Sequence, residues 1–226
     1  MSIIAVANQK GGVGKTAITI HLAHGLMREL SAKVLVVDAD PAASVFKHFR
    51  RRKSGNPPFI LTASPQPDLH RHLPRLFEAG AYDHCIIDCP AGASNITRSA
   101  MMAADIVLVP VQPSFCDFDS AEELMPIARQ ITEAKPDLQV LVVISRKLPG
   151  SNTYSREAKA AAAQFFATEG VNMRVLNQEI TNRAEIVRAY TEGKTIYERP
   201  SNGSRVEFDN LAEEIAQCLP ARTVAA

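Results

Sequence analysis

A glycine-rich stretch near the start of the sequence, ANQKGGVGKTAIT at 7–19, restricts the possible folds more than any other segment. An apolar run at 3–7 precedes it, and a segment of helical periodicity follows it. Glycines between a strand and a helix allow backbone N–H groups to converge on an anion at the helix N-terminus. In such a loop Lys15 reaches the β- and γ-phosphates of a nucleotide, and the Thr16 hydroxyl holds magnesium. The order of strand, loop and helix therefore predicts a phosphate-binding loop (P-loop).

The loop differs from the common phosphate-binding pattern at its start. That pattern has a glycine five places before Gly14, where this sequence has Gln9, and a second lysine, Lys10, comes next. A glycine-rich turn with incidental lysines is the alternative interpretation, but strand, loop and helix in the correct order favour a phosphate site. Lys15 already supplies the phosphate-binding lysine of the pattern, so Lys10 needs a separate explanation.

The rest of the sequence has the composition of an ordinary globular protein. Of its 226 residues, 46% are hydrophobic and 22% are charged, and the formal net charge is +1. This balance does not attract the whole chain to nucleic acid or anionic lipid, so such binding requires a local patch. The sequence has no basic leader, no C-x-x-C pair and no apolar run near the ~18 residues that a membrane span needs. We therefore expect a cytoplasmic protein with reduced thiols.

Short apolar runs alternate with longer segments of helical periodicity, which predicts an α/β fold: one P-loop NTPase domain over 1–226, with a mostly parallel, doubly wound sheet flanked by helices. The expected strands are 3–7, 33–38, 84–88, 105–111, 138–144 and 173–176. After the helix that follows the P-loop, the expected helices are 42–50, 67–79, 94–103, 117–134, 153–169, 181–192 and 205–218. An apolar residue at every fourth position predicts the buried stripe of the first helix: Ile18, Leu22, Leu26 and Leu30.

Three aspartates lie at or just beyond the ends of predicted strands. Asp38 and Asp40 come at the end of strand 33–38, and alternation puts both on the same side of the chain. Asp88 ends strand 84–88. One such aspartate could be only a helix cap, but three at carboxyl ends of strands in one sheet indicate a metal–nucleotide site. The sequence lacks the N-K-x-D stretch of guanine-specific P-loop proteins, so adenine is the expected base.

At this point several motifs resemble one family. KGGVGKT at 10–16 resembles the deviant Walker A motif of the ParA/MinD ATPases, DADP at 38–41 their second motif, and CIIDCPAG at 85–92 their Walker B motif. Two later segments, 107–124 and 180–198, are similar to the short, ParF-like branch that partitions plasmids. The resemblance covers nearly the whole chain.

The resemblance implies a site for ATP and Mg²⁺. The residues implied to bind ATP are Lys10, Gly11, Gly12, Val13, Gly14, Lys15, Thr16, Ala17 and Thr181. The residues implied at the magnesium or its water shell are Thr16, Asp38 and Asp88. Two positions depart from many relatives, namely Ala17 in place of a second threonine and Ala42 in place of glutamine. The first departure removes a possible hydroxyl contact to the α-phosphate but leaves the backbone N–H.

Catalysis is assigned by the same resemblance to Lys10, Lys15 and Asp40, with Asp40 orienting the attacking water. In this family the first lysine of the loop crosses a dimer interface to the partner's ATP, which would explain Lys10. A positioned cation also stabilises the negative charge that a loose phosphoryl transition state spreads over its oxygens. Loss of the γ-phosphate would remove the group that Lys10 contacts, so hydrolysis is expected to loosen the dimer.

The implied function is ATP-dependent segregation of plasmid or chromosomal DNA. An ATP-bound homodimer would bind DNA nonspecifically on the nucleoid, and a ParB-type centromere-binding partner would stimulate slow hydrolysis and release. One alternative is a ParA-like protein that positions a cargo other than DNA. Another is a metabolic ATP-dependent ligase or kinase on the same fold, for which Lys10 would be superfluous.

The expected surfaces follow from charge. The candidate DNA contacts are Arg183, Arg188, Lys194 and Arg199, and a second basic cluster is Lys47, Arg50, Arg51, Arg52 and Lys53. Each charge run could instead be only a solvated face. The sequence begins its first strand at Ser2 or Ile3, so we expect no N-terminal winged-helix extension. No membrane binding is expected, because the last helix has an acidic face, while its apolar residues would pack on the sheet: Val206, Leu211, Ile215 and Leu219.

Overall fold

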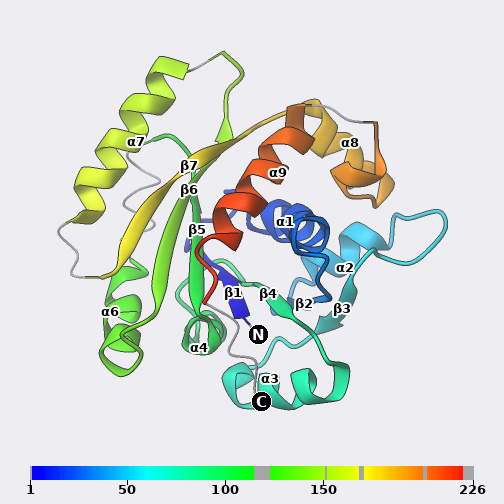
Figure 1. Ribbon diagram of the computed structural model, residues 1–226, viewed down its shortest axis with the longest axis horizontal. Coiled ribbons are helices and arrows are strands. Elements are labelled where there is room, and N and C mark those ends of the chain that lie inside the picture. The colour runs from blue at the N-terminus through cyan, green and yellow to red at the C-terminus, as the bar shows by residue number, and fades with distance from the viewer. Residues whose placement is uncertain (1, 115–122, 151, 168–170, 201–202, 221–226) are drawn as a thin grey trace.

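The computed structural model describes residues 2–114, 123–150, 152–167, 171–200 and 203–220. Within them a seven-stranded sheet has the order β3-β2-β4-β1-β5-β6-β7, and every neighbouring pair is parallel (Figure 1). The strands are β1 (Ser2–Val6), β2 (Val34–Asp38), β3 (Ile60–Ala63), β4 (His84–Asp88), β5 (Ile106–Val111), β6 (Gln139–Lys147) and β7 (Met173–Thr181). The predicted α/β class is confirmed.

Helices cover both faces of this sheet and create a separate core on each (Figure 1). One face carries α3 (Leu69–Gly80), α4 (Asn95–Ala103), α6 (Met125–Ala134) and α7 (Asn152–Ala167). The other carries α1 (Lys15–Leu30), α2 (Ser44–Phe49), α8 (Ala184–Glu192), the 3₁₀ helix η1 (Ile196–Glu198) and α9 (Gly203–Ala216). Every residue of β2, β4 and β5 is buried. Their continuous apolar runs are what strands covered on both faces require.

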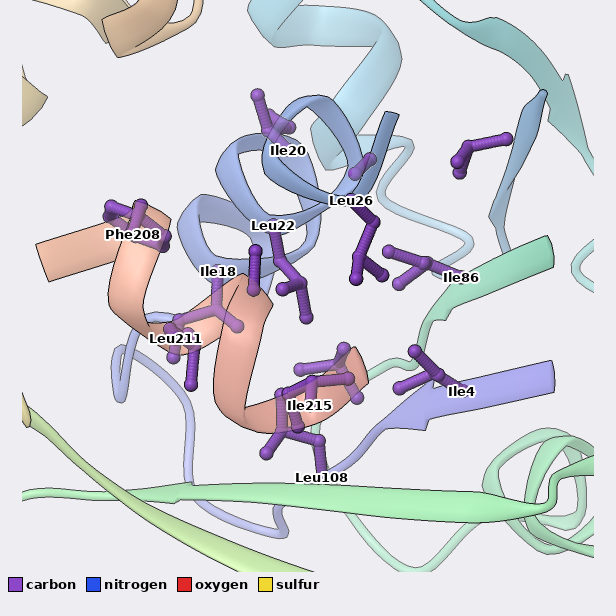
Figure 2. Close-up of a cluster of buried hydrophobic side chains, with 14 of the residues drawn as sticks. Ile4, Ile18, Ile20, Leu22, Leu26, Ile86, Leu108, Phe208, Leu211 and Ile215 are labelled. Carbon is purple, nitrogen blue, oxygen red and sulfur yellow. The ribbon is translucent and has the colours of Figure 1, made fainter. Parts of the chain in front are cut away.

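The contact between α1 and α9 organises the second core. Figure 2 shows the side chains that meet there: Ile18, Leu22 and Leu26 from α1, and Phe208, Leu211 and Ile215 from α9. The two helices approach closely at Gly25, where an added Cβ would lie 2.7 Å from the Tyr197 hydroxyl oxygen and 3.1 Å from the Ala212 Cβ. A larger residue at this position would therefore push α1 away from its neighbours.

Two residues of the predicted apolar stripes lie outside this core. Leu30 is 38% exposed and Val206 is 54% exposed, so the predictions for both are wrong. A residue repeated at every fourth position drifts by about 40° per step around an α-helix, which places Leu30 about 120° from Ile18. Val206 lies about 140° around α9 from Leu211 for the same reason, and Phe208 takes the buried position instead.

Other errors concern the two edges of the sheet and the end of β6, which continues to Lys147 instead of stopping at 144. The predicted elements omit β3, and they end β7 at 176, whereas β7 continues to Thr181 and α8 begins only at Ala184. Edge strands are partly exposed, so they lack the continuous apolar runs that reveal central strands. Of the predicted helix 117–134, α6 covers Met125–Ala134, and 117–122 lie outside the described residues. Within the described part of the chain, none of the helices combines the length and apolar character needed to span a membrane.

Candidate nucleotide-binding site

The predicted P-loop connects β1 to α1 at the carboxyl edge of the sheet. Gly12 and Gly14 have φ angles of 78° and 97°, a left-handed conformation that glycine adopts without steric cost. Gly14 is the N-cap of α1, and its carbonyl accepts the Ile18 N–H at 2.9 Å. The first N–H groups of a helix have no intrahelical acceptor, so this turn offers them to an anion.

Lys15 holds its ammonium group across the loop. Its Nζ donates to the carbonyl oxygen of Asn8 at 3.1 Å and to that of Lys10 at 3.0 Å. Lys15 is only 8% exposed, and burial lowers the pKa of the ammonium, while the Asp88 charge acts in the opposite direction. A cation that has lost most of its hydration is available to interact strongly with phosphate oxygens.

Three polar residues that the sequence prediction did not include brace the loop. Asn8 donates from Nδ2 to the Pro110 carbonyl at 2.7 Å and accepts the Lys10 N–H at 2.9 Å. Ser145, at the end of β6, donates to the Val13 carbonyl at 2.7 Å. The next residue, Arg146, donates to the Gly12 carbonyl at 2.6 Å. These bonds fix the loop backbone, which preorganises its N–H groups.

Asp88 is the buried carboxylate closest to the P-loop. It is fully buried, and it accepts the hydroxyls of Thr16 at 2.8 Å and Thr19 at 3.1 Å, both from α1. Burial raises the pKa of Asp88 to about 7, the hydrogen bond from Thr16 lowers it, and the neighbouring Asp38 carboxylate raises it further. The Thr16 and Asp88 predicted from the two motifs therefore meet directly.

Asp38 pairs in register with Asp88 on the adjacent strand. Its Oδ2 accepts the backbone N–H groups of Val45 at 3.0 Å and Phe46 at 3.2 Å, at the start of α2. Its Oδ1 is buried and lacks a hydrogen-bond donor among the described residues. Burial raises the pKa of this carboxyl as well. Asp40 is more exposed, and its Oδ1 accepts the Ala42 N–H at 2.8 Å.

These oxygens suit magnesium. Within the described ranges, no three side chains of His, Cys, Asp and Glu cluster in a way that could hold a metal on their own. Mg²⁺ does not need three such side chains, because it keeps several waters and binds one or two carboxylates together with substrate phosphates. The Thr16 hydroxyl, the Asp88 carboxylate and the orphaned Oδ1 of Asp38 offer that donor set beside a phosphate loop.

A cavity of about 440 Å³ adjoins the P-loop. Its walls include Gly14 and Ala17 at the start of α1, Arg146 after the buried part of β6, and Thr181 at the end of β7. The volume lies within the range of small-ligand pockets. The Thr181 hydroxyl donates to Glu207 at 2.7 Å, so the predicted ATP-binding residue lines the cavity while its side chain is engaged within the protein.

Comparison with known protein families identifies the family to which this phosphate-binding arrangement belongs. Residues 4–196 match the family described as the CobQ/CobB/MinD/ParA nucleotide binding domain. The chain belongs to this family. The resemblance to the ParA/MinD ATPases is thereby confirmed, and ATP and Mg²⁺ are the cofactors of that family. The narrower assignment to the ParF-like branch stays a prediction.

Similar ParA/MinD proteins match along nearly the full chain. Maintenance of carboxysome distribution protein A of Halothiobacillus neapolitanus is 27% identical over 221 residues, which cover 96% of this chain and 94% of that protein. The chromosome-partitioning ATPase Soj of Thermus thermophilus is 28% identical over 242 residues, covering 94% of each. MinD of Pyrococcus horikoshii, solved with Mg-ADP, is 22% identical with a TM-score of 0.68 over 95% of each chain, a likeness of fold alone. This chain is thus an ATPase of the ParA/MinD family.

The predicted DNA contacts of this ParA/MinD chain are largely engaged in ion pairs. Arg183 contacts Glu207 at 2.9 Å, Lys194 contacts Glu192 at 3.3 Å, and Arg199 also pairs with Glu192. Arg188 is exposed on α8. Paired cations contribute less attraction to an anionic partner, so the expected C-terminal patch is weaker than its sequence indicates.

His48 of α2, at one wall of the cavity, makes folding of this ATPase pH-dependent. It is 1% exposed, its Nε2 lies 3.1 Å from the Lys194 carbonyl oxygen, and its ring packs against Phe49 and Tyr190. Burial is the main cause that lowers the pKa of His48 to about 4. The charges of Arg51 and Arg52 lower this pKa further, whereas the Lys194 carbonyl and the Glu198 charge raise it. The folded state therefore favours the neutral form of the His48 ring.

We expect acid to destabilise the wild type relative to a His48→Phe variant. In the unfolded chain His48 takes up its proton near pH 6.5, but in the folded protein only near pH 4. The stability linked to this group is fully present above pH 6.5 and is lost as the pH falls toward 4. Between pH 7 and 5 the unfolding free energy of the wild type should fall by about 2 kcal/mol relative to the variant, measured by urea titration.

The comparison of the wild type with His48→Phe is needed because the titration of Asp88 changes the unfolding free energy in the opposite direction. Its raised pKa means that the folded state takes up a proton before the unfolded one, which favours folding as the pH falls toward 5. His72→Gln is the matched control, since the His72 side chain is 45% exposed. A wild-type-to-His48→Phe gap that stays constant between pH 7 and 5 would contradict the assignment.

Proposed function

We propose that this chain is a DNA-partition ATPase whose ATP-bound homodimer binds DNA nonspecifically. A ParB-type partner would stimulate slow ATP hydrolysis and so release the dimer from the nucleoid. The observation that carries the proposal is the second lysine, Lys10, in a loop where Lys15 already supplies the phosphate contact. Chromosome-partitioning relatives such as Soj of Thermus thermophilus support the choice of DNA as cargo.

The site residues have complementary roles in this proposal. Backbone N–H groups of the P-loop and the Lys15 ammonium would hold the β- and γ-phosphates, and the nucleoside would occupy the adjoining cavity beside Ala17 and Thr181. Bound Mg²⁺ would supply positive charge against the phosphates, held by Thr16 and Asp88, with Asp38 contacting its water shell. Asp40 would orient the attacking water, because it is the more accessible carboxylate at this edge.

Lys10 has a fixed backbone and a partly buried side chain. Its backbone N–H binds the Asn8 side chain at 2.9 Å and its carbonyl receives Lys15 at 3.0 Å, so the main chain is fixed. The side chain, which is only partly buried, takes no part in these two bonds. In a face-to-face dimer it would reach the terminal phosphate of the other subunit's ATP and stabilise the charge that develops there.

A second candidate is the positioning of a cargo other than DNA. The likeness to maintenance of carboxysome distribution protein A of Halothiobacillus neapolitanus favours it, at 27% identity over nearly the whole chain. Both candidates use the same nucleotide cycle and differ in the partner that stimulates hydrolysis. A metabolic ligase or kinase is disfavoured because Lys10 would then have no task.

DNA binding in different nucleotide states tests the proposal. With Mg²⁺ and a slowly hydrolysed ATP analogue, the protein should bind random duplex DNA; with ADP the affinity should fall by at least about 10-fold, as expected for a coupling of 1–3 kcal/mol. The affinity should also decrease steeply with salt, because phosphate contacts release counterions. Fluorescence anisotropy with a labelled duplex measures both effects. Equal affinity in ATP, ADP and nucleotide-free conditions, or binding that is insensitive to salt, would contradict the proposal.

A further inference from the structure

Four exposed cations lie together on and just after α2. We define the α2 ridge as these residues: Lys47, Arg50, Arg51 and Lys53. Among the described residues, none of the four forms an ion pair. The C-terminal cations differ, because Arg183, Lys194 and Arg199 are each paired with a glutamate. The ridge is therefore the stronger source of positive potential, in a protein whose net charge is only +1.

The ridge is held rigidly because the residue in its middle is used as a structural clamp. Arg52, whose side chain is 14% exposed, pairs with Glu198 of η1 and donates to the Gly193 carbonyl at 3.1 Å. Beside it, the Arg51 guanidinium lies over the Tyr190 ring of α8, 4.5 Å from the centroid. The chain packs so closely that a Cβ on Gly193 would lie 2.5 Å from the Arg52 nitrogen. These contacts fix the backbone that carries the ridge, which reduces the conformational entropy lost on binding.

The other end of α2 is attached to the nucleotide site. Asp38 Oδ2 accepts the N–H groups of Val45 and Phe46, only one or two residues before Lys47. The Oδ1 of the same carboxylate is buried and lacks a donor among the described residues, and Asp38 is in register with Asp88 on the adjacent strand. Any change in what Asp38 contacts through Oδ1 therefore acts on the backbone that carries the ridge. This gives the ridge a direct connection to the nucleotide state.

From these observations we propose that the α2 ridge is the surface that binds the phosphate backbone of duplex DNA. The affinity of this contact depends on whether ATP or ADP is bound to the protein. The inference rests on the proposed DNA-partition function. It assigns the DNA-binding surface to the α2 ridge in place of the C-terminal cations. Phosphate contacts by lysine and arginine carry no sequence information, which fits nonspecific binding.

A triple substitution, Lys47→Gln, Arg50→Gln and Lys53→Gln, tests this surface. It leaves Arg51 on Tyr190 and Arg52 on Glu198, so the packing of α2 is preserved. The control triple has the same charge change at exposed residues elsewhere: Lys33→Gln, Arg71→Gln and Arg75→Gln. Binding to a random duplex is measured with the ATP analogue and Mg²⁺ over a range of salt concentrations. Basal ATP hydrolysis and thermal unfolding confirm that each variant is folded.

The ridge variant should lose roughly 100-fold in affinity near 0.1 M salt, and the slope of log K against log salt should become shallower by about 3 units. The control triple should change the slope by less than about 1 unit. Equal slopes in the two triples would overturn the ridge while leaving the proposed function intact. A wild type that binds no DNA in any nucleotide state would overturn both the ridge and the proposed function. A wild type whose ridge binds anionic phospholipid vesicles instead of DNA would also overturn both.

Discussion

Replacing Lys15 with alanine should reduce kcat/KM for ATP hydrolysis by roughly 100-fold or more, with the loss shared between ATP affinity and turnover. The ammonium group is held over the P-loop by the carbonyls of Asn8 and Lys10, and burial has removed most of its hydration. It is therefore positioned to neutralise phosphate oxygens in a site of low effective dielectric. Phosphate release assays and isothermal titration with the ATP analogue and Mg²⁺ measure the two components.

Loss of fold does not account for this expected effect. Removing a desolvated ammonium also removes the cost of burying it, so the nucleotide-free variant should unfold within a few degrees of the wild type. Added ATP and Mg²⁺ should raise the unfolding temperature of the wild type and leave that of the variant nearly unchanged, because stabilisation follows the ratio of ligand concentration to Kd. Lys33→Ala, at an exposed lysine, is the matched control. Wild-type ATP affinity in Lys15→Ala would show that this loop is not the phosphate site.

The centre of the sheet was predictable from sequence because burial on both faces leaves a simple pattern. β2, β4 and β5 are buried at every position, and the runs of β2 and β4 end in Asp38 and Asp88, which mark the site. The edge strand β3 covers only Ile60–Ala63, with both end residues exposed and the two middle residues half-buried, which resembles a loop. The end of β7 reads as polar sequence for the same reason. Edge strands lack half of the neighbours that impose an apolar composition.

The candidate site divides in the same way. The P-loop and its aspartates carry strong local patterns, whereas Asn8, Ser145 and Arg146 act through single hydrogen bonds to loop carbonyls that only the fold brings near. Surface charge was misjudged for a related reason. Glu207 lies 24 positions from Arg183 in the sequence, yet the two side chains meet at 2.9 Å. A sequence reveals a cation directly, but its neutralising partner depends on the tertiary structure.

The Lys10→Ala variant should separate ATP binding from dimerisation. Two contacts of Lys10 within its own loop are made by its backbone: the N–H binds Asn8 Oδ1 and the carbonyl accepts Lys15 Nζ. Alanine preserves both bonds, so the loop should keep its shape and ATP affinity should stay within about 3-fold of wild type, a change worth less than 1 kcal/mol. Partner-stimulated hydrolysis should fall by at least about 100-fold, because a charge that acts in the transition state is lost.

The same substitution should keep the protein monomeric with the ATP analogue and Mg²⁺, under conditions in which the wild type dimerises. Sedimentation velocity measures this, and Lys15→Ala provides the contrast, since it should be monomeric because its ATP affinity is reduced. Two negatively charged triphosphates facing each other repel, and each Lys10 would place a positive charge between the two subunits to offset that repulsion. A Lys10→Ala protein that still dimerises with ATP and hydrolyses it at the wild-type rate would leave the second lysine without a function in this site. Loss of ATP affinity as severe as in Lys15→Ala would instead place Lys10 on the phosphates of its own subunit.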